Sequence, residues 1–236
     1  MASLQTSLLI SGTDTDSGKT VVTSALIAYW QRYCWAYRLG VCKPVQSGAG
    51  DREFYSKLFK LDQSIEALNP LWYKTPVAPP LAAAIEGKRV DLAYAWKMYS
   101  QLVRDRDWTL VEGAGGLGSP VSEELTVADI AYQWRLPVLL VVPVKLGAIS
   151  AAVANVALAE QKKLTLRGIV LCCTQPCTQD QLDSWAPVEM IESLTRVPVL
   201  GVAPYLKHVR DLEKLSDVGA QFDLERIMPK PFWAGH

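Results

Sequence analysis

Histidine is scarce in this sequence, with His208 and His236 as the only two in 236 residues. Histidine is the side chain that most often moves protons in enzymes, so histidine-based acid–base chemistry is a poor explanation for this chain. Cysteine is also scarce and odd in number, at five, which suits a reduced cytoplasmic protein better than a disulfide framework. Cys172, Cys173 and Cys177 could suggest a metal site. Adjacent residues on a strand point to opposite faces, and no histidine is near, which argues against one.

Long apolar runs and clusters of one charge are missing as well. No stretch approaches 18 uninterrupted apolar residues, so no membrane-spanning helix is expected. The start, MASLQTSLLISG, has no basic segment before its short apolar run and does not resemble a signal peptide. Lys+Arg and Asp+Glu are balanced at 24 each, without a basic cluster. Neither nucleic acid nor a membrane is therefore expected as a partner.

What the sequence does have is apolar residues in short runs, amounting to 50% of the chain. That is enough for the core of one α/β domain spanning residues 1–236. Six runs are almost uninterrupted, which is typical of strands covered on both faces in a parallel sheet. These predicted strands are residues 6–11, 38–43, 108–112, 137–144, 168–173 and 197–202.

Helical patterns alternate with the predicted strands, and this order indicates a doubly wound α/β fold with a mostly parallel sheet flanked by helices. The predicted helices are residues 19–34, 51–59, 92–104, 127–133, 148–160 and 180–194. Residues 68–82 hold four prolines and no clear period, so we expect a long loop there. In such folds ligands bind at the carboxyl ends of the strands.

The stretch GTDTDSGKT begins at Gly12, after the first apolar run and before a helical pattern. Strand, glycine-rich loop and helix in this order predict a phosphate-binding loop and a fold like that of P-loop nucleoside triphosphatases. Lys19 would reach the β- and γ-phosphates, and Thr20 would place its hydroxyl on Mg²⁺. The usual pattern leaves four residues after the first glycine, whereas five separate Gly12 from Gly18. The longer loop can carry groups from residues 13–16 towards a second substrate, as a kinase-like or ligase-like enzyme requires.

Charged residues also end two other predicted strands. Glu112 ends WTLVE and precedes GAGG, where a carboxylate is the usual second magnesium contact and glycines permit close approach of a ligand. Lys43 ends a strand in VCKPVQSG, which places it in the same crevice as the phosphate loop. Ser47 and Asp51 follow closely. Two lysines in this crevice suit a reaction that gathers negative charge in its transition state.

Four motifs occur in the order and at the spacings of one known family: GTDTDSGKT, KPVQSG, VEGAGG with PVS soon after, and PVLLVVPVKLGAI. Together they make the chain resemble the dethiobiotin synthetases over residues 6–206. The family's phosphate loop has the same extra residue. The resemblance implies an ATP- and Mg²⁺-dependent ring closure, in which CO₂ or bicarbonate carboxylates 7,8-diaminononanoate and the carbamate is phosphorylated before the ring closes. It also implies a homodimer with the diamine bound across the interface.

The resemblance assigns roles to individual residues. The residues expected to act in catalysis are Lys43, Lys19 and Thr15. The expected Mg²⁺ ligands are Thr20, Asp51 and Glu112. Substrate contacts are expected from Lys43, Ser47, Gly116 and Ser150. Contacts to ATP are expected from Gly12, Thr13, Asp16, Ser17, Gly18, Lys19, Thr20, Val21, Asp51, Glu112, Gly113, Ala114, Gly115, Cys173, Thr174, Pro204, Tyr205 and Leu206.

Three positions depart from the family's pattern. Asp16 stands where many members have glutamate, so the carboxylate reaches less far. Ser150 stands where some members have an asparagine that helps to hold the substrate carboxylate. Cys173 stands where many members have an asparagine that reads adenine, and a thiol cannot offer the same donor and acceptor pair.

Two related classes of protein remain as alternatives. Partitioning or septum-site ATPases share the fold, but they carry a second lysine early in the loop, where this chain has Thr13 and Asp14. Amide-forming enzymes of cofactor biosynthesis are closer in chemistry, but they usually add a glutaminase domain, for which 236 residues leave no room.

Overall fold

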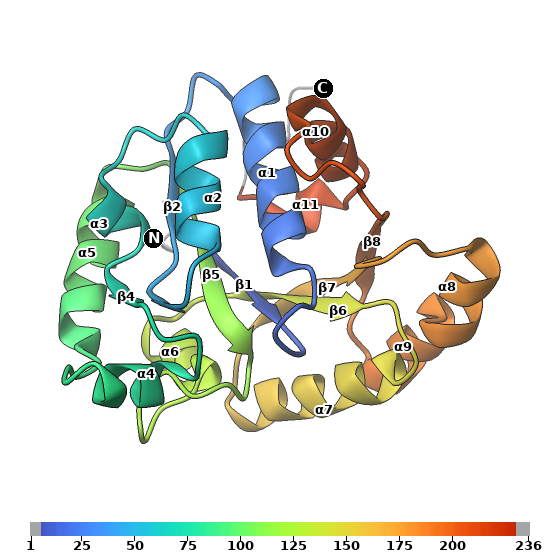
Figure 1. The fold of residues 1–236 in the computed structure, drawn as a ribbon. Helices are drawn as coiled ribbons and strands as arrows, with labels where there is room; N and C mark the ends of the chain where they lie inside the picture. The colour runs from blue at the N-terminus through green and yellow to red at the C-terminus, as the bar shows by residue number, and fades with distance from the viewer. Residues whose placement is uncertain (1–5, 230–236) are drawn as a thin grey trace, which may run out of the picture.

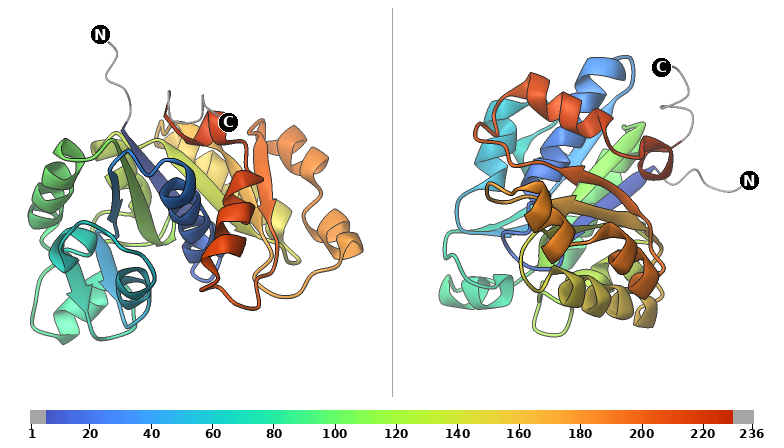
Figure 2. Two further views of the ribbon diagram at one scale, coloured as in Figure 1. Left: turned by 90° about the horizontal axis from the view of Figure 1, so that it is seen from above. Right: turned by 90° about the vertical axis from the view of Figure 1, so that its right-hand side faces the viewer.

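The computed structural model describes residues 6–229. Residues 1–5 and 230–236 lie outside the described residues, and with them the first part of MASLQTSLLISG and His236. The described residues form three layers, with a sheet in the middle and helices on both sides (Figure 1). Figure 2 shows the same layers from above and from one side.

The central sheet has six parallel strands. Their bounds are β1 Ser7–Gly12, β2 Leu39–Cys42, β5 Trp108–Gly116, β6 Val138–Pro143, β7 Leu166–Cys172 and β8 Val199–Ala203. The strands lie in the order β2-β5-β1-β6-β7-β8, and every neighbouring pair is parallel. This confirms the parallel α/β fold predicted from the apolar runs. The predicted strands are all present with small shifts at their ends, and β5 continues through the glycines after Glu112.

Helices cover both faces of the sheet. Alternate residues of each strand point to opposite faces, and because the strands are almost entirely apolar, both faces must be buried. The helices of the two covering layers are α1 Lys19–Tyr33, α2 Asp51–Leu58, α5 Leu92–Arg104, α6 Val127–Gln133, α7 Ala148–Gln161, α8 Gln179–Trp185, α9 Val188–Thr195, α10 Leu212–Ala220 and α11 Leu224–Ile227. Leu8 and Ile10 share a core with α1 and α10 on one face. Leu9 and Val111 share the other core with α6 and α7, on the opposite side of the sheet in Figure 1.

The expectation of a long loop over residues 68–82 is wrong. This stretch holds the last residue of α3 (Ile65–Leu68), the strand β4 (Leu71–Tyr73) and the beginning of α4 (Pro79–Ile85). β4 pairs in parallel with β3 (Val45–Ser47) to make a second, two-stranded sheet. Three-residue strands are too short to show a period, and the prolines at the beginning of α4 are compatible with the first turn of a helix.

The prediction of one helix over residues 180–194 is also wrong, because two helices, α8 and α9, occupy this stretch. They separate at Pro187, which precedes the first residue of α9. The residue before a proline is driven out of the helical region, and Ala186 has φ −141° and ψ 54°. The sequence prediction also left out α10 and α11.

Strand pairing brings the candidate site residues to one edge of the sheet. Ile10 of β1 is level with Glu112 of β5, and Gly12 is level with Gly116. Cys42 at the end of β2 is level with Val111, so Lys43 emerges beside Glu112. Between residues 6 and 229, no helix has both the length and the apolar character to cross a membrane.

Candidate active site

The loop from β1 to α1 packs too closely for side chains at its glycines. A β-carbon at Gly12 would lie 2.0 Å from Ser17 Oγ. Gly18 has φ 92°, a left-handed conformation, and directly precedes α1. Across the loop, a β-carbon at Gly116 would lie 2.7 Å from the carbonyl oxygen of Thr13. The end of β5 therefore lies directly against the loop backbone.

Lys19 is buried at the beginning of α1 and bends over the loop. Its Nζ donates to the carbonyl oxygen of Asp14 at 2.9 Å and to Ser17 Oγ at 3.4 Å. Burial lowers the pKa of Lys19, although the negative charge of Glu112 acts in the opposite direction. A cation placed here beside free N–H groups of the helix end can bind phosphate oxygens.

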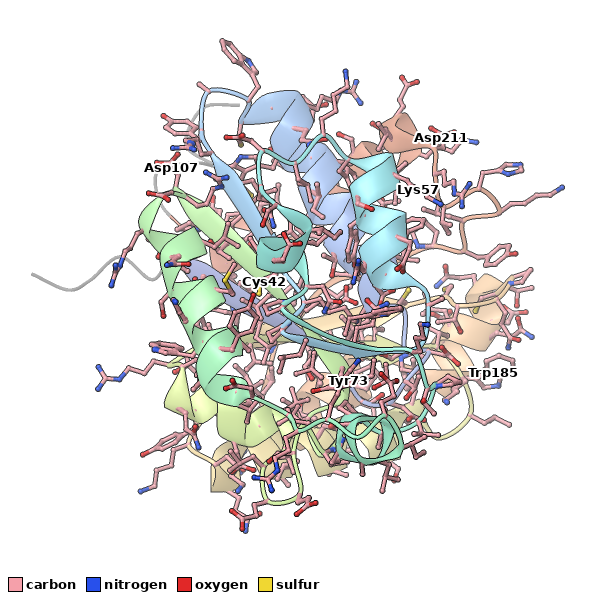
Figure 3. All side chains as sticks on the ribbon, turned by 60° about the vertical axis from the view of Figure 1, so that its left-hand side comes forward. Cys42, Lys57, Tyr73, Asp107, Trp185 and Asp211 are labelled. Carbon is pink, nitrogen blue, oxygen red and sulfur yellow. The ribbon has the colours of Figure 1, made fainter. Side chains whose placement is uncertain are left out.

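Lys43 is the centre of a buried ion cluster. Its Nζ lies 2.5 Å from Asp51 Oδ2 and 2.8 Å from Glu112 Oε1. Cys42, the residue before it, lies inside the molecule (Figure 3), so the chain leaves the core directly at Lys43. Burial opposes the charged form of Lys43, but the carboxylates of Glu112 and Asp51 raise its pKa overall. The site therefore holds a permanent cation at the end of β2.

The two carboxylates are themselves fixed by hydroxyl groups. Thr20 Oγ1 donates to Asp51 Oδ1 at 2.9 Å, which joins the beginnings of α1 and α2. Thr23 Oγ1 donates to Glu112 Oε2 at 2.7 Å, and the Tyr55 hydroxyl donates to the same oxygen. Burial would raise the pKa of Asp51, but Lys43 and the hydrogen bonds lower it.

A cavity of about 550 Å³ lies at this edge of the sheet. Its lining joins the phosphate loop, the ion cluster, the beginning of α2 and the segment before α4. Eleven of the predicted site residues line it, namely Thr15, Asp16, Ser17, Gly18, Lys19, Thr20, Lys43, Ser47, Asp51, Ala114 and Gly115. Within residues 6–229, Ser47 Oγ is one of the buried polar atoms that has no hydrogen-bond partner. The hydroxyl of Ser47 is thus buried at the cavity wall without a partner among the described residues.

The other predicted site residues do not line this cavity. Glu112 is fully buried beneath it and reaches it through Lys43. Five more predicted residues lie in the phosphate loop, in β5 or next to them, but not in the cavity wall. They are Gly12, Thr13, Val21, Gly113 and Gly116. Ser150 is exposed on the first turn of α7, separate from the cavity lining.

The predicted adenine-binding residues lie where β7 and β8 end. The N–H of Cys173 donates to the carbonyl oxygen of Ala203 at 2.9 Å, which joins Cys173 and Thr174 to the segment Pro204, Tyr205 and Leu206. A β-carbon at Gly18 would lie 3.5 Å from Thr174 Cγ2, so this edge adjoins the phosphate loop. Burial, and to a smaller extent the neighbouring Cys177, raises the pKa of the Cys173 thiol to about 11.

The oxygen atoms of Thr20 and Asp51 suit Mg²⁺ as they stand, whereas Glu112 would have to give up its bond from Lys43 to become a ligand. This ion prefers oxygen ligands and is usually held by one or two carboxylates together with substrate phosphates. Thr20 and Asp51 are already in contact, and Lys43 bridges Asp51 to Glu112. Across the described part of the chain, no three His, Cys, Asp or Glu side chains group to hold a metal by themselves. A magnesium ion here would therefore take the rest of its ligands from phosphate oxygens and water.

The sequence analysis did not predict several residues of the site. Tyr55 follows Asp51 by four residues, and Thr23 follows Lys19 by four, so each lies one helical turn beyond a predicted site residue. That spacing was the available signal. Residues 76–79 also line the cavity, but the proline-rich sequence gave no indication of their position.

A parallel sheet covered on both faces, with a glycine-rich loop leading to a lysine and a threonine at a helix start, defines a P-loop nucleotide-binding protein. A family model described as an AAA domain matches residues 6–212. Among solved structures, a ParA family ATPase from Chlorobium tepidum has a TM-score of 0.58 over 91% of this chain and 96% of that chain. At 12% identity, this likeness concerns the fold alone.

Sequence comparison identifies the family. The ATP-dependent dethiobiotin synthetase BioD of Gloeothece citriformis is 55% identical over 94% of this chain and 98% of that protein. The protein of the same name from Crocosphaera subtropica is 50% identical over 94% of this chain and 99% of its own length. The chain belongs to the dethiobiotin synthetase family.

Proposed function

We propose that this chain is an ATP-dependent ligase that converts 7,8-diaminononanoate and CO₂ into dethiobiotin during biotin biosynthesis. The observation that carries the proposal is the placing of Lys43, Asp51 and the phosphate loop around one 550 Å³ cavity, in a member of the dethiobiotin synthetase family. Such a site acts mainly by positioning its substrates and by compensating charge.

The reaction would proceed in three steps. One amine nitrogen attacks the carbon of CO₂, an electron pair of a C=O bond moves to oxygen, and a proton leaves to solvent, giving a carbamate. A carbamate oxygen attacks the γ-phosphorus of ATP, and the bond to the bridging oxygen breaks to release ADP. The second amine attacks the carbonyl carbon of the resulting anhydride. The carbon–oxygen bond to phosphate then breaks, and phosphate and a proton leave as the ring closes.

The two lysines would stabilise the negative charge of these steps. Lys19 adjoins the free N–H groups of α1, where the β- and γ-phosphates would bind. Lys43 would contact the carbamate and the transferred phosphoryl group, and its raised pKa keeps it cationic. Thr15 and Asp16 line the same cavity and would face the γ-phosphate and the amines.

Thr20, Asp51 and Glu112 would hold Mg²⁺, which neutralises charge on the β- and γ-phosphate oxygens when bound. Further contacts to ATP would come from the loop, from β5 and from the ends of β7 and β8. They are Gly12, Thr13, Ser17, Gly18, Val21, Gly113, Ala114, Gly115, Cys173, Thr174, Pro204, Tyr205 and Leu206. The diamine would contact Ser47, whose hydroxyl has no partner in the described structure, together with Gly116 and Ser150.

We further propose a cytoplasmic homodimer in which each chain, residues 1–236, is one domain that works on small molecules without nucleic acid or membrane. The support for the dimer is the membership of the dethiobiotin synthetase family, and Leu146, which is 77% exposed and stands four residues before Ser150, would lie at the interface. A second copy that covers Leu146 would enclose the diamine near Ser150.

The test is to incubate the protein with ATP, Mg²⁺, bicarbonate and 7,8-diaminononanoate and to detect the ureido product by mass. We expect a product that contains the carbon of labelled bicarbonate, formed together with one ADP for each ring. Omitting the diamine should stop ADP release. Steady ATP hydrolysis without diamine, and no ureido product, would instead support a switch ATPase.

A further inference from the structure

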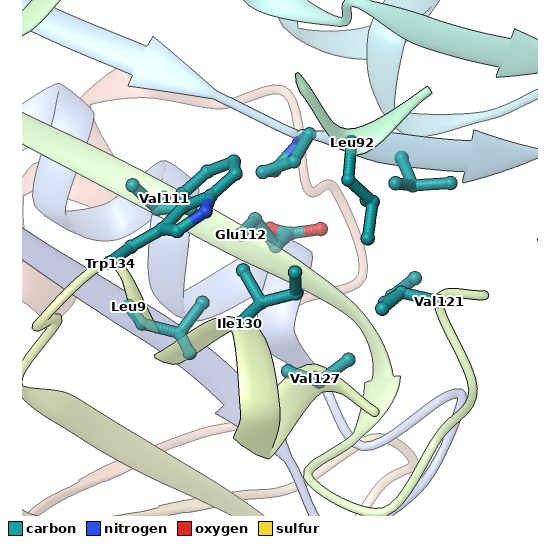
Figure 4. Close-up of a pocket in the computed structure, with 12 residues that line it drawn as sticks. Leu9, Leu92, Val111, Glu112, Val121, Val127, Ile130 and Trp134 are labelled. Carbon is teal, nitrogen blue, oxygen red and sulfur yellow. The ribbon is translucent and has the colours of Figure 1, made fainter. Parts of the chain in front are cut away.

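A second cavity, of about 20 Å³, lies beside β5 in the core that this strand shares with α6. Its walls are formed by side chains of β5, α6 and the segment after β2, among them Val111, Val127, Ile130 and Trp134. Figure 4 shows these side chains around Glu112. A β-carbon at Gly113 would lie 3.1 Å from Val127 Cγ1, so β5 and α6 approach closely at this glycine.

The cavity suits a small apolar molecule better than water. A buried water needs about two to four polar partners. The lining is almost entirely carbon, and Glu112 is its only residue with a charged side chain. The oxygens of Glu112 already accept bonds from Lys43, Thr23 and Tyr55.

The cavity also adjoins the place where the carbamate would form. Ala114 lines both this cavity and the 550 Å³ cavity. Pro44 lines the small cavity, and Lys43, the residue before it, lines the large one. The two cavities are thus neighbours, with Ala114 of β5 and the chain at Lys43 and Pro44 between them.

We propose that this small cavity binds CO₂ for the carboxylation step, an inference that rests on the proposed function. CO₂ is linear, uncharged and without a net dipole, so an apolar cavity can hold it without a hydrogen bond. Bicarbonate is an anion, and an apolar wall without a partner charge would oppose its entry. The site therefore selects CO₂ over bicarbonate and delivers it to the amine beside Lys43.

Nitrous oxide tests the site in the unaltered protein. It is linear and has the same number of electrons as CO₂, but it does not form a carbamate with an amine. With saturating ATP and diamine, nitrous oxide should raise the apparent KM for CO₂ and leave kcat unchanged. An unchanged KM at the highest dissolved concentration would mean that the cavity does not serve the reaction.

Two variants that each enlarge a side chain by one methylene distinguish an effect on this cavity from a general effect on core packing. Val127→Leu fills the cavity, whereas Val156→Leu adds the same bulk to a buried residue of the same core in α7, away from the cavity lining. Since one methylene in an apolar pocket changes discrimination by about tenfold or more, Val127→Leu should raise the KM for CO₂ by about tenfold. The KM for ATP and the KM for the diamine should stay unchanged in both variants, and Val156→Leu should keep the KM for CO₂.

Three outcomes decide the proposal. A higher KM for CO₂ in Val127→Leu, with loss of the nitrous oxide effect, supports the site. An unchanged KM for CO₂ in a folded Val127→Leu protein means that the void is a packing gap or that the carbamate forms in solution before binding, and overturns it. Absence of ureido product in the unaltered protein would overturn the proposed function itself, which is a separate result.

Discussion

Lys43 Nζ lies 2.8 Å from Glu112 Oε1 inside the protein, and this ion pair joins the residue after β2 to the middle of β5. A buried pair of this kind adds little to stability, because both charges lose their hydration. Removing one partner is costly, because the other charge is then left alone. The pair is better explained by the chemistry that a fixed cation at this place allows.

Lys43→Gln should impair the chemical step more than nucleotide binding. The amide keeps part of the side-chain length but loses the charge that would stabilise the carbamate and phosphoryl groups, so kcat should fall by about 10²–10³. Single-turnover kinetics and ATP affinity should be measured together. An equal loss in both would mean that Lys43 only binds nucleotide.

Lys19→Ala should nearly abolish turnover while the protein stays folded. The lysine is expected to contact the β- and γ-phosphates, and losing such a contact costs about 10²–10³ or more in rate. Product formation and circular dichroism would check both parts. Activity near that of the unaltered protein would disprove the phosphate-loop assignment.

Tyr55→Phe should weaken Mg²⁺ use. Tyr55 donates to Glu112, and partners that orient metal ligands typically matter about 10–100-fold for metal affinity, so half-maximal activity should need about tenfold more Mg²⁺. The matched control is Tyr99→Phe, which removes the hydroxyl that donates to Ser7 Oγ at 2.9 Å. Both variants should lose stability, but an equal Mg²⁺ requirement in the two would show that Tyr55 is only structural.

Asp129→Asn should destabilise the protein in a way that depends on pH. Asp129 lies 2.5 Å from Lys162 and accepts from Thr126. Burial opposes its charge, but these bonds lower its pKa to about 2. Because the folded pKa lies below the unfolded value, the stabilisation is complete above about pH 4 and is lost as the pH falls towards 2. With screening by solvent, the loss at pH 7 should be about 1–2 kcal/mol in chemical unfolding, and it should disappear as the pH falls through 2.

Nucleotide preference should be loose. A thiol at Cys173 cannot make the paired contact that an amide makes with adenine. A lost pair is worth about 1–3 kcal/mol, so ATP should exceed GTP or CTP by about tenfold or less in kcat/KM. Cys173→Asn should sharpen the preference. A native preference above about a hundredfold that the asparagine leaves unchanged would place base recognition in other groups, such as the backbone near Pro204.

Much of the fold could be predicted because strands buried on both faces require uninterrupted apolar runs. The runs that became β1 and β6 have every residue buried. The meeting of Lys43 and Glu112 could also be predicted, because parallel strands end at the same edge of the sheet. The division of residues 180–194 into two helices could have been predicted from Pro187, because a proline drives the residue before it out of the helical region.

Contacts that depend on helix orientation were harder to predict. The hydrogen bond from Tyr55 to Glu112 requires one particular face of α2 to point towards β5. The spacing along the chain shows that Tyr55 shares a face with Asp51, but it does not show which way that face points. The position of residues 76–79 depends on the pairing of β3 with β4, two strands of three residues each. Pairs so short leave no periodic signal in the sequence.

Gly116 packs directly against the backbone of Thr13, and this contact joins the end of β5 to the phosphate loop. No flexible side chain lies between them to absorb a displacement, because even a β-carbon would not fit. A shift of the loop is therefore transmitted to the end of β5, and the reverse holds equally, since coupling between two binding sites is reciprocal. In the proposed reaction, a loop that tightens around the nucleotide should therefore also reshape the place where the diamine binds.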